Sequence, residues 1–493
     1  MSGDVWTQLL SVALVGTDRY QSALPTLAPP LDTLPVSGVL EAAGAVTVAR
    51  RAGVLPHRQA TPDPAPPDTR PVMPPIAARW LAQLLSPECK DAVWIRTFTL
   101  IQETLTLASR RGYRVPPSLL PALLDLATRK QHLRPLVGAV GGERARWLAS
   151  QRAEWGWLLK QETDILDEAV WRDGPLPERV AYLKALRRRD PAAARERLMK
   201  AWSAEHPAHR AALLSALAVN LGPEDEELCE RALDSRLWKL RTQAAALLAL
   251  LPGSAYRERM TARALACVRR DAVGQIVVTP PTTCDQDMIR DGVLPEPPDR
   301  SSKPVWWLRQ VVAHTPLAAW ETLDPDPSSL LRRERYGSGA EVLEAGWAEA
   351  IDRQNDSVWA SAFFDYWISQ GRTFAPPEAP VQLLRLVPQD QLVEYAAANF
   401  KGGSSQIIAV LEHCPTPWPA KLAEAALTAL GAAAISWNTL PYVAMGLDPA
   451  LADEAKRRLD ATTAIRPDGP VSAIYRNVVT TLSIRFQIHK ELA

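Results

Sequence analysis

The sequence predicts an all-α protein, with an α-solenoid of helical repeats followed by a second, irregular helical lobe. Apolar residues recur at spacings of three and four along most of the 493 residues, which is the period of an amphipathic helix. Runs of alternating β-branched residues, which are typical of strands, are nearly absent. Two segments superpose at an offset of 31 residues, a length typical of helical repeats.

Composition limits the class of protein further. A hydrophobic content of 47% and a charged content of 23% are typical of folded chains. The net charge of +1 gives no overall attraction to nucleic acid or anionic membranes. Five cysteines without C-x-x-C spacing indicate neither a disulfide framework nor a zinc site, so we expect no metal or cofactor. Asp4 stands where a secretory signal carries a basic residue, and no long apolar run occurs, so we expect a cytoplasmic protein.

The first elements are two helices, predicted over residues 4–15 and 38–52, which form an N-terminal part covering residues 1–55. Residues 56–75 contain repeated proline, which removes backbone donors and fixes φ, so this segment is expected to be a linker or surface loop. Helical patterns resume at residue 76. We assign residues 76–270 to a helical repeat region.

The 31-residue repeat is clearest between "HRAALLSALAVNLGPEDEE", starting at His209, and "LRTQAAALLALLPGSAYRE", starting at Leu240. Each unit is an apolar helix that ends near a glycine, Gly222 or Gly253, where a left-handed C-cap costs little. An acidic or serine-led start of the next helix follows. A single helix pair cannot bury both of its apolar stripes, so adjacent pairs are expected to stack.

Three charged residues are assigned to the repeat itself. Asp234 lies at a predicted interhelix turn, where its carboxylate is expected to cap the next helix, with Arg241 reaching back toward this acidic edge. Asp190, followed by proline, marks another helix start in a third, degenerate unit. The pattern resembles a HEAT repeat, in which an aspartate at the turn precedes an arginine in the second helix by about six positions. Here the separation is seven.

The helical rhythm stops over residues 271–303, which we expect to form a long non-helical loop. Within it, "QIVVTPP" resembles a short strand. Asp285, Asp287 and Asp291 resemble a calcium-binding loop, but Ile289 occupies a ligand position, so a solvated acidic turn is the favoured interpretation. Residues 304–493 return to helical patterns and form the C-terminal helical lobe.

Trp306 and Trp307 open this lobe. Adjacent helical residues point about 100° apart, so the two indoles are not expected to share one seam, and one is a candidate for exposure. We therefore predict that Arg290, Asp291 and the exposed indole form a partner-docking surface. The alternative is that both indoles are buried and the loop covers the end of the repeat stack.

A family resemblance extends over most of the chain. The segments "LRRRDPAAARERLMKAWSAEHPAHRAALLSAL" and "KPVWWLRQVVAHTPLAAW", with "ALVGTDR" at residues 13–19, resemble a bacterial family of unknown function with HEAT-like repeats. Members of that family are typically encoded beside a MoxR-type AAA ATPase, a von Willebrand factor A protein and a SWIM zinc-finger protein. The resemblance implies such protein partners. It assigns no catalytic residue.

No catalytic constellation is evident in the sequence. His413 and Cys414 are neighbours, but no acidic orienting partner is identifiable, so a packed pair is expected. The favoured interpretation is a non-enzymatic scaffold or adaptor for protein partners. The alternative is a HEAT-like DNA-binding or repair enzyme of the glycosylase type, which would grip DNA with basic residues and exposed indoles. The charge balance makes nucleic acid the weaker candidate.

Overall fold

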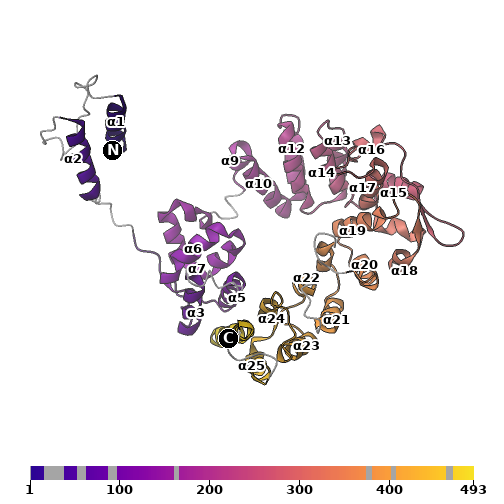
Figure 1. The fold of residues 1–493 in the computed structure, drawn as a ribbon. Helices are drawn as coiled ribbons and strands as arrows, with labels where there is room; N and C mark the ends of the chain where they lie inside the picture. The colour runs from indigo at the N-terminus through magenta and orange to yellow at the C-terminus, as the bar shows by residue number, and fades with distance from the viewer. Residues whose placement is uncertain are drawn as a thin grey trace. The chain divides into compact units, whose positions relative to one another are not determined.

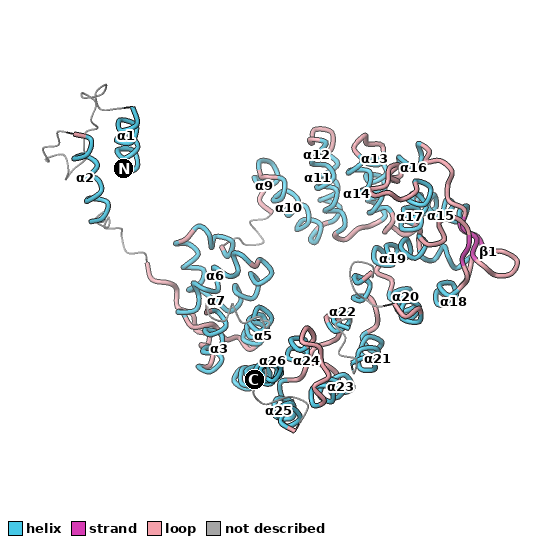
Figure 2. The backbone as a smooth tube through the Cα atoms, viewed as in Figure 1, coloured by secondary structure: helices cyan, strands magenta, loops and turns pink. Residues whose placement is uncertain are grey.

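The computed structural model describes residues 2–15, 38–52, 63–86, 97–159, 166–372, 380–400, 407–461 and 470–493. Helices make up most of these residues, and the strands among them form one small three-stranded sheet (Figures 1 and 2). The predicted all-α class is confirmed. None of the described helices combines the length and the apolar character that a membrane crossing requires.

The chain divides into two compact units, Met1–Ala65 and Pro66–Ala493. The boundary falls inside the proline-rich segment at residues 56–75. The first unit contains α1 (Ser2–Val15) and α2 (Val39–Ala52), close to the two helices predicted there. They pack through a small core of Leu9, Ala42 and Val46.

The second unit begins with residues 66–74, which contain no helix. The α-helices that follow among the described residues are α3 (Pro75–Leu85), α5 (Thr97–Arg110), α6 (Leu120–Arg129) and α7 (Arg134–Gln151). Their core also contains Ile484, Ile488 and Leu492 from the C-terminal helix α26 (Pro470–Leu492). Arg485 of α26 is buried against Glu103 of α5, with Nη2 2.9 Å from Oε1. Helices from the two ends of this unit therefore share one core. The predicted division of the chain at residues 270 and 303 placed these helices in separate parts.

The helices of the 31-residue repeat form the next group. They are α9 (Glu168–Asp173), α10 (Leu176–Arg189), α11 (Pro191–Ala201), α12 (Pro207–Leu214), α13 (Glu226–Leu233), α14 (Trp238–Leu248) and α15 (Ala255–Cys267). The helices α10, α12 and α14 begin at residues 176, 207 and 238, so successive starts are 31 residues apart. Helix α12 contacts both α10 and α14, and most of these helices share a core of their own. The predicted period is therefore present in the structure over three units.

Two details of the predicted repeat are wrong. Asp190 precedes α11, the second helix of its pair, whereas Asp234 precedes α14, the first helix of its pair, so the two aspartates are not equivalent. Gly253 has a left-handed φ of 72° after α14, as predicted. Gly222 does not, because Asn220 takes the left-handed conformation there, with φ 52°, and Gly222 continues in extended backbone.

Residues 271–303 are not free of regular structure, so the predicted non-helical loop is wrong in part. Strand β2 (Ile276–Val278) pairs antiparallel with β1 (Val268–Arg270) and parallel with β3 (Arg335–Tyr336), which confirms the predicted strand. Helix α16 (Gln286–Arg290) comes next. Asp285 caps it by accepting a hydrogen bond from the amide of Met288. The sequence pattern missed α16 because one and a half turns are too short to show a period.

The remaining helices belong to the C-terminal lobe. They are α17 (Lys303–His314), α18 (Pro327–Arg332), α19 (Val342–Gln354), α20 (Ser357–Ser369), α21 (Gln389–Asn399), α22 (Ile408–Leu411), α23 (Ala420–Gly431), α24 (Leu440–Gly446), α25 (Ala452–Asp460) and α26. Contacts between a helix and the second one after it recur, as in α17 with α19 and α18 with α20. One core runs from Ala264 to Leu482 through this lobe.

Candidate functional site

Asp291, predicted to lie on a docking surface, is buried in an ion-pair cluster at the end of α16. Its Oδ1 lies 2.7 Å from Nη2 of Arg259, and its Oδ2 lies 2.6 Å from Nη1 of Arg263. Burial alone raises the pKa of this carboxyl, but the hydrogen bonds from the two arginines outweigh it and leave the pKa below its usual value. Asp291 therefore fastens α16 to α15, and it is not a free surface residue.

Arg290 joins the same segment to α13. Its Nε donates to Oδ1 of Asp234 at 2.7 Å, and its Nη1 donates to Oε2 of Glu230 at 3.2 Å. The side chain of Arg290 remains about one-third exposed. Both Arg290 and Asp291 therefore hold α16 against the repeat, and their joint replacement is expected to lower stability.

Trp306 and Trp307 are both covered. Their indole N–H groups donate to consecutive carbonyl oxygens, those of Leu294 and Pro295, each at 2.9 Å. Trp307 is buried and Trp306 is partly buried against the same core. The segment that contains Leu294 and Pro295 thus contacts both indoles, although they point in different directions from α17. The geometric argument for an exposed indole therefore fails. These contacts agree with the alternative interpretation, in which both indoles are covered and the loop covers the end of the repeat stack.

The charged residues assigned to the repeat have different roles from one another. Asp190 marks the start of α11 as predicted, and it caps this helix, since its Oδ1 accepts from the amide of Ala193 at 2.9 Å. Asp234 lies at the turn but caps nothing, and its carboxylate accepts from Arg290 instead. Arg241 reaches back to this turn, where its Nη1 donates to the carbonyl oxygen of Ser235 at 2.8 Å. The arginine half of the predicted ladder is thus made to the backbone.

A groove of about 810 Å³ lies on α9, α10 and α11. The aromatic rings of Trp171 and Tyr182 line it, with centroids 5.7 Å apart. The hydroxyl of Tyr182 donates to Glu168 and accepts from Arg197. Three cations and three carboxylates contribute to the lining, and they are Arg189, Arg197, Lys200, Glu168, Asp190 and Glu196. The groove is therefore aromatic, polar and electrically balanced.

A family model supplies the comparison that decides the chain's membership. The model of a family of unknown function, DUF5691, matches residues 8–492. The chain belongs to DUF5691. No curated protein and no solved structure matches it. The family of unknown function implied by the sequence is confirmed, and its function has to be argued from this chain's own surfaces.

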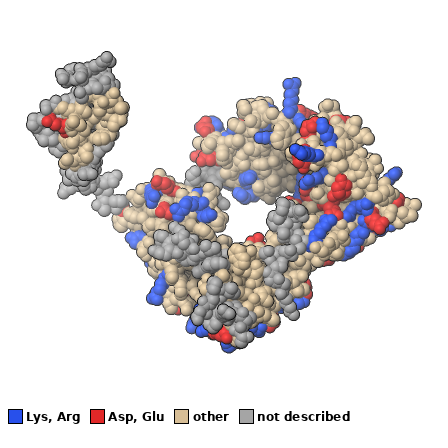
Figure 3. Space-filling view, in the orientation of Figure 1, with Lys and Arg blue, Asp and Glu red and all other residues tan. Residues whose placement is uncertain are grey.

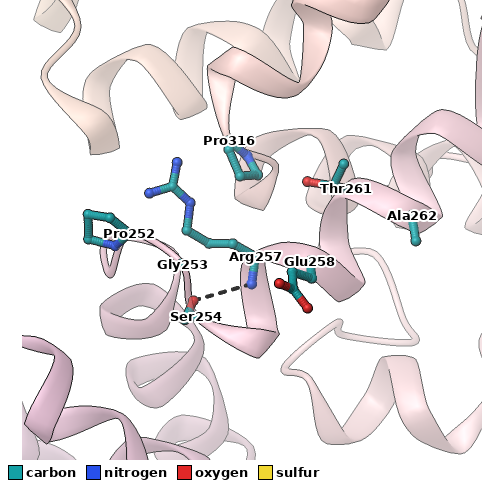
Figure 4. A pocket seen from close by; sticks show the side chains of 8 residues that line it. All are labelled: Pro252, Gly253, Ser254, Arg257, Glu258, Thr261, Ala262 and Pro316. Carbon is teal, nitrogen blue, oxygen red and sulfur yellow. Dashed lines mark hydrogen bonds between the residues drawn. The ribbon is translucent and has the colours of Figure 1, made fainter.

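A second hollow in this DUF5691 chain lies at the start of α15. It has a volume of about 480 Å³, and the side chain of Arg257 extends into it between Pro252 and Pro316 (Figure 4). Burial lowers the pKa of the guanidinium, which has no hydrogen-bond acceptor among the described residues. Glu258 lines the same hollow, so its charges also balance.

An exposed indole does occur at a position that the sequence analysis did not single out. Trp238, the first residue of α14, is 52% exposed, and the adjacent Leu237 is 41% exposed. The available signal was a pair of large apolar residues between Arg236 and Lys239, directly before the periodic part of the helix. Among the described residues, no group of three or more His, Cys, Asp or Glu side chains is placed to hold a metal ion.

Proposed function

We propose that this DUF5691 chain is a non-enzymatic helical scaffold, of HEAT-like solenoid form, that binds protein partners. The observation that carries the proposal is the groove on α9, α10 and α11, where aromatic rings lie among equal numbers of cations and carboxylates. Protein interfaces combine aromatic residues with paired polar groups, whereas nucleic-acid sites need an excess of cations for the phosphates. Lys and Arg also alternate with Asp and Glu on the face drawn in Figure 3.

Two of the described thiols, Cys229 and Cys414, also favour a binding role over nucleophilic catalysis. Burial raises the pKa of the Cys229 thiol to about 12 and that of Cys414 to about 11, so both remain protonated near neutral pH. The Sγ of Cys414 donates to the carbonyl oxygen of Val410, and Nδ1 of its neighbour His413 lies 2.8 Å from that of Ala409. Each side chain is thus engaged by its own helix backbone.

The resemblance of the sequence suggests the partners: a MoxR-type AAA ATPase and a von Willebrand factor A protein. The test is co-elution of the purified chain with these two proteins in size-exclusion chromatography. Arg189→Glu reverses a charge that lines the groove, and we expect it to weaken co-elution about fivefold or more, because like charges then oppose the partner. Arg188→Glu is the matched control, since Arg188 is exposed on the same helix end but does not line the groove.

A nucleic-acid assay distinguishes the alternative. We expect no saturable binding of a fluorescent DNA duplex or single strand at low salt. Tight, salt-sensitive DNA binding that Arg189→Glu abolishes would overturn the scaffold proposal in favour of a HEAT-like DNA-binding protein. Equal co-elution of both arginine variants with the partners would remove the groove from the proposal.

A further inference from the structure

We infer that the turn before α14 docks an acidic segment of a partner protein that also carries large apolar side chains. The surface consists of Arg236, Leu237, Trp238 and Lys239, and we call it the Trp238 turn. The inference rests on the proposed function, because it names a partner chemistry for a scaffold. It concerns the α13–α14 turn and none of the residues of the groove on α9, α10 and α11.

Exposure of the apolar pair is the first observation. Trp238 is 52% exposed and Leu237 is 41% exposed, in a turn between helices whose other large apolar residues are mostly covered. Exposed tryptophan side chains are the residues that most often anchor protein interfaces. The indole costs little conformational entropy when a partner covers it, since only two side-chain torsions become fixed.

The repeat shows that this pair is not needed for local structure. One period earlier, the positions of Leu237 and Trp238 are occupied by His206 and Pro207. His206 caps α12, with its Nδ1 accepting from the amide of Ala208, and Pro207 begins the helix without needing a donor. At α14 the cap position holds Leu237, which provides no side-chain cap. The turn thus presents apolar surface where its neighbour has a structural cap.

Charge identifies the partner's chemistry. Arg236 donates no side-chain hydrogen bond to any described residue, and the Nζ of Lys239 lies 5.7 Å from the centre of the Trp238 ring. The carboxylate within the turn, Asp234, is already engaged by Arg290 at 2.7 Å. Arg236 and Lys239 therefore flank the apolar pair, and neither is paired with a carboxylate among the described residues. Their positive charge complements an acidic partner.

The start of α14 adds to this attraction. The first turn of the helix contains no acidic residue, and the backbone amides of Trp238 and Lys239 have no acceptor among the described residues. A carboxylate brought by the partner could accept from these amides while its apolar neighbour covers the indole. Two side-chain cations are few for a nucleic acid, whose specific complexes neutralise many phosphates. A protein segment that carries both acidic and large apolar side chains matches the positive charge and the exposed apolar pair of this turn.

The test uses the whole chain and a synthetic probe. The probe is a short fluorescein-labelled peptide that alternates Glu with Leu, with two controls in which Gln replaces Glu or Ser replaces Leu. Fluorescence anisotropy is expected to show saturable binding of the Glu–Leu peptide, weakened by salt, and at least about tenfold weaker binding of either control peptide. The same assay with single-stranded DNA is expected to show no binding.

Two variants separate docking from folding. Trp238→Ala is expected to weaken binding of the Glu–Leu peptide by about tenfold or more. Leu237→Asp supplies the missing helix cap, so its thermal midpoint should be equal to or above that of wild type, while its negative charge should abolish binding. Val358→Ala is the control, since Val358 is 67% exposed in the first turn of α20, whose cap is Asp356, and binding should be unchanged.

Each remaining outcome overturns the inference. These outcomes are no binding by wild type, equal binding of the Gln–Leu peptide, unchanged binding by Trp238→Ala, and DNA binding that Trp238→Ala abolishes. The proposed function is tested separately by co-elution with the ATPase and von Willebrand A proteins. Co-elution that Trp238→Ala leaves intact and Arg189→Glu weakens would leave the scaffold in place and remove the Trp238 turn as its docking surface.

Discussion

Two buried aspartates hold this molecule together in different ways. Asp225, in the short helical turn η7 (Pro223–Asp225), accepts from Nη1 and Nη2 of Arg187 at 3.0 and 2.6 Å. Asp291, at the end of α16, accepts from Arg259 and Arg263 at 2.7 and 2.6 Å. Both carboxylates are at most 1% exposed. Arg187 is also fully buried, whereas the side chains of Arg259 and Arg263 are 32% and 20% exposed.

The exposure of the arginine partners distinguishes the two ion-pair clusters. Arg187 of α10 also donates to the carbonyl oxygens of Val219 and Asn220, so the buried Arg187–Asp225 pair fastens α10 to the turn before α13, in the next repeat unit. Asp291 instead fastens the segment after the repeat to the last repeat helix, with solvent reaching its partners. A buried charge left without its partner costs far more than one that water can solvate. The two clusters should therefore differ in how much stability they lose.

Asp225→Ala should have the larger effect. It leaves the fully buried guanidinium of Arg187 without a carboxylate, which typically costs about 3–5 kcal/mol. Hydrogen exchange of the amides in α10 to α13 measures this as a loss of local protection. Glu227→Ala, which removes an exposed helical ion pair with Arg231, is the control and should change protection by less than about 0.5 kcal/mol. Similar losses in both variants would show that water reaches Arg187.

Asp291→Asn should have a smaller effect, about 2 kcal/mol at neutral pH, because Arg259 and Arg263 can turn toward water and Arg259 keeps Glu230. The loss should appear in the exchange of amides in α16. Because the pKa of Asp291 is lowered in the folded protein, its contribution is present above the unfolded pKa of about 3.9 and is lost as pH falls through the folded pKa.

The pH dependence checks that assignment. The difference in α16 protection between wild type and Asp291→Asn should be constant near neutral pH and shrink as pH falls below about 4. A difference that persists unchanged in acid would mean that the carboxylate charge is not what holds α16. A difference as large as that of Asp225→Ala would remove the distinction between the two clusters.

Much of the fold could be predicted because it follows from local patterns. The 31-residue period survives in the starts of α10, α12 and α14, and the Asp190-Pro191 pair starts α11 as its chemistry requires. Helix α16 could not be read, since its five residues are too few for a period. The return of α26 to α3 and α5 could not be read either, because contacts across nearly the whole chain leave no trace in spacing.

The exposure of a charged or aromatic residue could not be predicted from the sequence, because it depends on contacts between helices. Asp291 stands in a polar segment, yet it is buried because α15 presents Arg259 and Arg263 to it. Arg187, in a run of three arginines at the end of α10, is likewise completely buried. Conversely, Trp238 begins an apolar helix, α14, and is 52% exposed. Single positions on a helix pattern do not tell which side the neighbouring helix covers.

Asp234→Ala should have the smallest effect. The capping role predicted for Asp234 would make its loss cost about 1 kcal/mol, but α14 has no side-chain cap, and Asp234 makes only a surface ion pair with Arg290. Such pairs contribute about 0.2–1 kcal/mol, and Arg290 retains Glu230, so we expect less than about 0.5 kcal/mol. Asp190→Ala is the comparison: Asp190 does cap α11, and its loss should cost about 1 kcal/mol in the exchange of the first α11 amides. Equal costs for the two aspartates would mean that the pair with Arg290 is as strong as a helix cap. Arg290 and Asp234 would then hold α16 as firmly as the pairs of Asp291 with Arg259 and Arg263 do. The exposure of the Arg290–Asp234 pair to solvent would not have weakened it.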